Sequence, residues 1–125
     1  MTTTESVLEF LRKEGFCPEV DENGSIVFKY QMVTFLLINN EEDNDFFQLT
    51  IPYIYDVTDD NRDIMLEAAN KTNTTMKVAK ICVIDDSVWA FFEILLDQSP
   101  AVEDIMPRAL NILMATRQTF YENIN

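Results

Sequence analysis

The sequence predicts an α+β fold in which three helices pack on a largely antiparallel sheet of five to six strands. Apolar residues recur at helical spacing near both ends of the chain and once in its middle, and they alternate in the stretches between. Short turn signals separate neighbouring alternating runs, which is typical of hairpins. The expected order is helix, three or four strands, helix, two strands, helix. With 125 residues, 47% of them hydrophobic, we predict a single domain over residues 1–125.

The first predicted helix has signals at both of its ends. Thr2 and Glu5 have the spacing of a capping box, and Gly15 can adopt the left-handed conformation that ends a helix. The residues between them include an apolar stripe at helical spacing: Val7, Leu8 and Leu11. A brief extended segment over residues 16–20 then leads to Asp-Glu-Asn-Gly at 21–24, where Asn-Gly favours a hairpin turn.

Residues 26–37 change the parity of their apolar alternation halfway along. Ile26, Phe28 and Tyr30 alternate with the residues at 27, 29 and 31 (Val, Lys and Gln). A similar alternation continues on positions of the other parity at Val33, Phe35 and Leu37. A two-residue turn at 31–32 (Gln-Met) would set Phe28 opposite Phe35 and Tyr30 opposite Val33. One long bent strand is the alternative, because Gln-Met lacks the usual turn residues.

The middle of the chain is predicted to hold a loop, a strand and a helix. Residues 39–45 (NNEEDND) form a solvated connector, since they lack the glycine and the distal glutamate of a calcium-binding loop. Residues 46–57 read as a long aromatic strand that bends or ends near Pro52. A helix is expected to begin at residues 58–60 and to fade by Thr74. Its apolar stripe is Ile64, Met65, Ala68 and Ala69.

The last third of the chain predicts a hairpin followed by a long helix. Two apolar runs, 76–84 and 88–96, are separated by Asp-Asp-Ser at 85–87. Ser99 is the expected cap of the closing helix and Pro100 its first residue. Pro107 lies inside the helical pattern, so a kink or a one-turn pre-helix is expected there. The apolar stripe of this helix is Val102, Met106, Ala109, Leu113, Thr116 and Phe120.

Composition excludes several classes of function. The chain has 22 acidic and 9 basic residues and a formal net charge of -13, which disfavours binding to nucleic acid and to anionic membranes. It contains no histidine, so Ser-His and Cys-His pairs are impossible, and its two glycines cannot form a phosphate-binding loop. Cys17 and Cys82 are expected to be free thiols. We therefore expect no enzymatic activity, metal or cofactor.

The beginning of the chain also bears on where the protein acts. Residues 1–10 lack the basic and apolar regions of a secretory signal, and no apolar run reaches the length of a membrane span. A cytoplasmic protein is expected.

The run Val88–Leu96 (VWAFFEILL) is apolar on both faces of its predicted strand. Alternate residues place Val88, Ala90 and Phe92 on one face and Trp89 and Phe91 on the other. Exposing large apolar side chains forgoes roughly 1.5–3 kcal/mol each, and three helices are too few to cover both faces of the sheet. A second copy of the chain would cover the remaining face. The alternative is that the first helix or the loop at residue 39 folds over it.

A resemblance to a known family rests on element order and apolar spacing. The hairpin at DENG followed by IVFKY, the pair KICVIDDSVWAFFEILLD and the closing PRALNILMATRQTFYE resemble the YbjN-like branch of the type III secretion chaperone-like fold. Some members of this branch are described as sensory transduction regulators. The resemblance implies a compact, commonly dimeric α+β domain that binds protein segments and does not catalyse a reaction. It supplies no catalytic or ligand-binding residue, and residues 31–32 depart from it because such sequences often have glycine in this turn.

These observations predict a non-enzymatic, chaperone-like or regulatory module that acts as a homodimer and binds a protein partner through an apolar surface. The candidate residues for the dimer or partner surface are Trp89, Phe91, Met106 and Phe120, with ordinary core packing as the alternative for each. The competing function is a small-ligand sensor with an apolar pocket between the sheet and the C-terminal helix.

Overall fold

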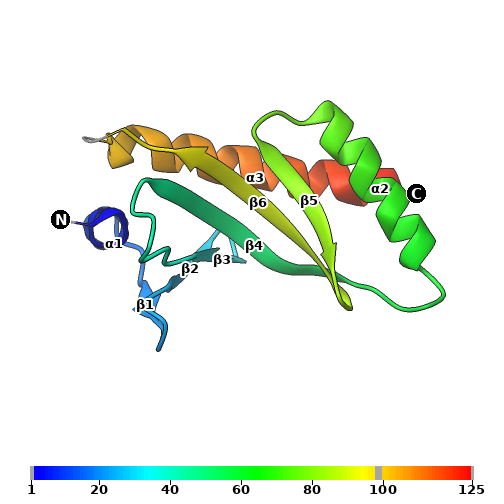
Figure 1. Cartoon of the computed structure of the whole chain (residues 1–125), viewed down its shortest axis with the longest axis horizontal. Coiled ribbons are helices and arrows are strands. Elements are labelled where there is room, and N and C mark those ends of the chain that lie inside the picture. Colours follow the sequence, from blue (N-terminus) through cyan, green and yellow to red (C-terminus); the bar gives the residue numbers. More distant parts are fainter. Residues whose placement is uncertain (1, 98–99, 125) are drawn as a thin grey trace.

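The computed structural model describes residues 2–97 and 100–124 and confirms the predicted fold class. Six strands form one antiparallel sheet with the strand order β1-β2-β3-β4-β6-β5, and three helices pack on it (Figure 1). The elements, in chain order, are α1 (Thr3–Lys13), β1 (Glu19–Val20), β2 (Ile26–Tyr30), β3 (Val33–Leu37), β4 (Phe46–Asp56), α2 (Arg62–Thr75), β5 (Ala79–Ile84), β6 (Ser87–Leu95) and α3 (Val102–Ile124).

The predicted cap of α1 and the turn at residues 21–24 are both present. The Thr2 hydroxyl accepts a hydrogen bond of 3.1 Å from the amide of Glu5, which gives an otherwise unpaired helical donor a partner. Gly15 has a φ of +87° just after α1. In the next turn, the Asp21 carboxylate accepts hydrogen bonds from the amides of Asn23 and Ser25, both 2.9 Å, and aligns β1 with β2.

The β2–β3 hairpin has the register that the parity switch predicts. Phe28 pairs with Phe35 and Tyr30 with Val33, so the alternative of one bent strand is wrong. Gln31 and Met32 have φ values of +50° and +67°, the left-handed pair that a two-residue hairpin turn requires. The turn therefore forms without its favoured residues, because burial of the alternating apolar side chains on both strands fixes the register.

Three predicted boundaries differ from the structure. Helix α2 begins at Arg62 and not at residues 58–60, because Thr58 and Asn61 instead form a local turn in which the Asn61 side chain accepts a 2.7 Å hydrogen bond from the Thr58 amide. Strand β5 begins at Ala79, after Val78 adopts a φ of +71°, and β6 begins one residue early, at Ser87. The two-residue turn at 85–86 makes the predicted hairpin of β5 and β6.

The buried stripe of α2 also differs in one member. Met65, Ala68 and Ala69 are buried as expected and Thr72 extends the stripe, whereas half of the surface of Ile64 is exposed. Thr72 satisfies its hydroxyl by donating a 2.8 Å hydrogen bond to the Ala68 carbonyl. A polar residue can therefore continue an apolar stripe inside a helix.

Helix α3 is one element from Val102 to Ile124 and runs through Pro107. All six residues of its predicted stripe are buried. The predicted cap at Ser99 lies outside the described residues.

The three helices share one face of the sheet with the core. Side chains from α1, α2 and α3 pack on the inner face of the sheet, where the buried strand residues include Phe35, Phe47, Leu49, Ala90 and Phe92. Helix α3 runs behind β6, and α2 packs beside it near β5 (Figure 1). The opposite face, here called the outer face, carries no helix within residues 2–97 and 100–124.

Candidate functional site

The outer face carries the residues that the sequence singled out on β6. Trp89 is half-buried, Phe91 is 8% exposed and Leu95 is 78% exposed, whereas Val88, Ala90 and Phe92 face the core. Neither α1 nor the loop at residue 39 folds over this face. The loop instead binds α1 at its first turn, where the Thr4 hydroxyl donates to the Asn39 side chain and the Thr3 hydroxyl donates to the Asn44 carbonyl.

Aromatic side chains form a cluster on the outer face. The Trp89 ring stacks on Phe91, with centroids 6.1 Å apart, and meets the edge of Tyr53 at 4.9 Å. Phe91 is covered from the other side by Lys80, whose Nζ lies 5.6 Å from the ring centroid. Phe91 is therefore buried largely by its neighbours on the same sheet. Tyr53, 72% exposed, is the outermost member of the cluster.

A polar network crosses three strands beside the aromatic cluster. The Glu93 carboxylate forms a 2.6 Å ion pair with Lys80 on β5 and accepts a 2.6 Å hydrogen bond from the Gln48 amide on β4. The hydrogen bond to Glu93 is the main reason that the pKa of Lys80 is raised above its ordinary value, against an opposing effect of burial. The charged and amide groups of these three residues therefore bond to one another, and the aromatic cluster lies beside them.

Cys82 also lies on the outer face, paired with Trp89 across β5 and β6. Burial raises the pKa of its thiol, partly offset by the nearby Lys80 ammonium. A raised pKa keeps a cysteine in its unreactive thiol form near neutral pH. Cys82 and the exposed Cys17 are both free, as the sequence predicted, and nothing in the geometry activates Cys82 as a nucleophile.

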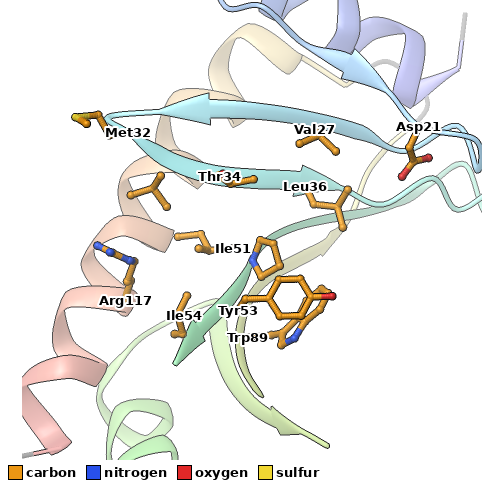
Figure 2. Close-up of a pocket in the computed structure, with 12 residues that line it drawn as sticks. Asp21, Val27, Met32, Thr34, Leu36, Ile51, Tyr53, Ile54, Trp89 and Arg117 are labelled. Carbon is orange, nitrogen blue, oxygen red and sulfur yellow. The ribbon is translucent and has the colours of Figure 1, made fainter. Parts of the chain in front are cut away.

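A cleft of about 600 Å³ opens on the same face, between β3 and the second half of β4 (Figure 2). Its lining is mainly apolar and includes Val27, Leu36, Pro52, Tyr53 and Trp89. Strands β3 and β4 are paired only at Leu36–Thr50 and Leu37–Leu49 and then separate. The cleft therefore occupies the space where the sheet parts.

Pro52 explains why the two strands part. Continuing the register from Leu36–Thr50 would set Thr34 opposite Pro52. Ile38 donates to the Gln48 carbonyl, so the alternation of an antiparallel ladder directs the backbone groups of Leu36 and Thr34 toward β4. Proline has no N–H to give to the Thr34 carbonyl, and the next residue, Tyr53, has a φ of +53°. The ladder ends there, and Thr34 keeps its backbone N–H and C=O directed into the cleft.

The far wall of the cleft carries a cation from α3. Arg117 lines the cleft beside Val33 and Ile54, and its guanidinium lies 4.8 Å from the centroid of the Tyr121 ring. The Tyr121 hydroxyl donates a 2.8 Å hydrogen bond to the Ile54 carbonyl on β4, which ties helix, ring and strand together. Among residues 2–97 and 100–124, no carboxylate lies within 4.0 Å of this guanidinium.

The outer edge of the sheet at β5 is closed by α2. The Asn73 side chain accepts a 2.7 Å hydrogen bond from the Ile81 amide and donates one of 3.0 Å to the Ile81 carbonyl. One carboxamide thus satisfies both backbone groups that Ile81 would offer to another strand. Nothing in the sequence distinguishes Asn73 from the neighbouring asparagines, so this contact had no sequence signal.

Two of the four candidate residues lie in the core. Met106 and Phe120 are fully buried on α3 against the inner face of the sheet, because both belong to the stripe that packs there. Within this fold they are closed to a partner, and core packing, the alternative reading, describes them. Trp89 and Phe91 share the outer face with Tyr53 and Pro52, and Arg117 of α3 lines the cleft beside them; the sequence analysis named none of these three as a site residue. The prediction of a bend at Pro52 was the available signal for the cleft.

The described part of the chain holds no group of three acidic, cysteine or histidine side chains that could bind a metal ion. Within that same part, no helix is long and apolar enough to span a membrane.

Comparison with solved structures supports the fold assignment. A crystal structure of an uncharacterized protein from Methanothermobacter thermautotrophicus is similar over 96% of this chain and 95% of its own, with a TM-score of 0.67 and 16% identity. The Yersinia pestis type III secretion chaperone SycH, solved in complex with a stable fragment of YscM2, is similar over 94% of this chain and 99% of its own, with a TM-score of 0.63 and 13% identity. The chain has a type III secretion chaperone-like fold. No protein-family model and no curated protein sequence matches it.

Proposed function

We propose that the protein is a non-enzymatic module that binds extended segments of other proteins on the outer face of its sheet. The observation that carries the proposal is the aromatic cluster of Tyr53, Trp89 and Phe91 beside the cleft, on a face without a helix. An open apolar groove beside unpaired strand backbone suits an extended polypeptide. The net charge of -13 favours basic partners. The fold shared with SycH, a chaperone solved with a protein fragment, agrees with this role.

A homodimer in the cytoplasm, related to the YbjN-like family, completes the proposal. The family relation rests on the order of elements in the sequence. The proposal of a dimer is based on two exposed apolar side chains. Leu95 at the end of β6 is 78% exposed, and Met32 in the β2–β3 turn is 94% exposed. Size-exclusion chromatography with light scattering should give about twice the monomer mass of 14.5 kDa. A monomer mass at high concentration would contradict the dimer. Segment binding would still be judged by the separate test below.

Segment binding is tested with an unfolded, basic polypeptide that lacks tryptophan, such as reduced and alkylated ribonuclease A. Trp89 is the single tryptophan of this chain, so its fluorescence reports occupancy of the outer face. Wild-type protein should give a saturable change in emission. Tyr53→Asn should weaken binding by about tenfold, or ~1.4 kcal/mol, because it removes the exposed ring at the cleft and asparagine tolerates the positive φ.

Leu66→Asn is the matched control, because Leu66 is half-exposed on α2, away from the outer face. It should leave binding unchanged. Equal weakening by both substitutions, or no change in Trp89 emission with wild-type protein, would contradict binding at this face.

A small-ligand sensor is the competing function, and the cleft volume lies within the range of small-molecule sites, roughly 300–1,000 Å³. The cleft, however, opens on the outer face between two strands, and of the residues on α3 only Arg117 lines it. This position differs from the predicted pocket between sheet and helix. A sensor would show a rise in melting temperature with a small molecule and no response to the unfolded polypeptide.

A further inference from the structure

We propose that the cleft recognises the C-terminal end of an extended apolar segment, with the terminal carboxylate bound by Arg117. This inference rests on the proposed function and names the part of the partner that the cleft binds. Arg117 is the group that carries it, because it is the only cation among the described residues that line this mainly apolar cleft. A guanidinium is the side chain best matched to a carboxylate, which it can bind with two parallel hydrogen bonds.

The guanidinium is oriented and unoccupied by any carboxylate of the described chain. Its contact with the Tyr121 ring, 4.8 Å from the centroid, holds its plane, and the Tyr121 hydroxyl is fixed on the Ile54 carbonyl. Arg117 is one of seven basic residues with no carboxylate within 4.0 Å among the described residues, and it is the one that lines the cleft. Lys80, on the outer face beside the aromatic cluster, is paired with Glu93.

The position of Arg117 favours a chain end over an internal carboxylate. Arg117 belongs to α3, which packs on the inner face, and it lines the cleft at the end where β3 and β4 are unpaired (Figure 2). A group that binds Arg117 from the outer face enters this gap, with α3 behind it. A polypeptide can end in the gap, whereas a continuing chain would have to turn back within it.

The remaining groups of the cleft suit the residues that precede the terminus. The free N–H and C=O of Thr34 offer an antiparallel pairing for the main chain, and Tyr53 and Trp89 form an apolar wall for its side chains. Figure 2 shows Asp21 at the opposite end of the lining from Arg117. A basic residue a few positions before the terminus would therefore meet a carboxylate there.

The test uses three pools of hexapeptides, each beginning Lys-Gly. The first has four mixed aliphatic residues and a free C-terminal carboxylate, the second has the same residues and a C-terminal amide, and the third is an amide with Asp at its last position. None contains tryptophan, so the emission of Trp89 in the full chain reports binding. The free-acid pool should bind about tenfold more tightly than either amide pool.

Arg117→Gln should abolish this preference and bind the acid and amide pools alike. Arg108→Gln is the matched control, because Arg108 is exposed on the same helix and does not line the cleft, and it should keep the tenfold preference. A urea unfolding curve confirms that the Arg117→Gln protein is folded.

Each other outcome overturns the inference. Equal binding of the acid and amide pools to wild-type protein would show that no terminal carboxylate is recognised. Tight binding of the Asp-amide pool would show that a side chain suffices. No response to any pool would exclude the cleft as the site for a chain end. The proposed function is judged separately, since Tyr53→Asn and the unfolded polypeptide test the outer face without a C-terminal requirement.

Discussion

Replacing Asn73 with alanine should destabilise the fold by opening the edge of β5. The carboxamide of Asn73 makes two hydrogen bonds to Ile81, of 2.7 and 3.0 Å, and both are partly buried. A hydrogen bond contributes about 0.5–1.5 kcal/mol net, so two are worth about 1–3 kcal/mol. Because the Asn73 side chain lies on an exposed surface where water can replace it, we expect the lower half of that range, about 1–2 kcal/mol.

Asn70→Ala separates this effect from helix propensity. Asn70 is exposed one turn earlier on α2 and makes no side-chain hydrogen bond to the described residues. Alanine is a better helix former than asparagine by up to about 0.7 kcal/mol, and both substitutions gain this amount. The difference between the two variants therefore isolates the contact with Ile81.

Urea unfolding followed by circular dichroism measures the difference. Asn70→Ala should be as stable as wild type or slightly more stable. The free energy of unfolding of Asn73→Ala should be about 1–2 kcal/mol lower than that of Asn70→Ala. Hydrogen exchange should show faster exchange of the Ile81 amide in the second variant alone. Equal stability of the two variants, with unchanged protection of Ile81, would refute the view that this side chain closes the sheet.

Two further predictions concern the hairpin turn and the network on the outer face. Replacing residues 31–32 with Asn-Gly should raise the free energy of unfolding by about 1 kcal/mol, because both positions have positive φ and the new residues tolerate it. A loss of stability in urea would contradict that reason. The pKa of Lys80 is raised by Glu93, so its contribution to stability is complete below the unfolded value of 10.5 and is lost as the pH rises through the raised value. The stability difference between wild type and Lys80→Met should therefore be constant near neutral pH and shrink above 10.5, and a difference that stays constant in strong alkali would show that the ion pair does not cause it.

The sequence was most informative where a single periodicity decides the structure. The parity switch at residues 31–32 predicted the register of β2 and β3, and the alternating three- and four-residue steps predicted the buried face of α3. Both follow from burial, because a shift in register or rotation would move all the apolar side chains of the element away from the core together. The capping of α1 was predictable for a different reason, because Thr2 and Glu5 interact within one turn.

The features that the sequence did not reveal depend on contacts between distant elements. The burial of Phe91 needs Lys80 and Trp89 on either side, and the start of β5 depends on the positive φ of Val78. Met106 and Phe120 belong to the stripe of α3 that faces the sheet, and this position buries both of them. Only part of the cleft was predictable from the sequence. Pro52 indicated a bend in β4, but the register with β3 determines that Thr34 is the residue left without a partner.

The short seam between β3 and β4 has a mechanical consequence. These strands share two residue pairs, whereas β4 and β6 share eight, so the sheet resists separation very unevenly along its width. The first three strands are therefore joined to the rest mainly by their share of the common core, which includes Phe35, Leu37 and Leu49, and much less by backbone hydrogen bonds across the seam.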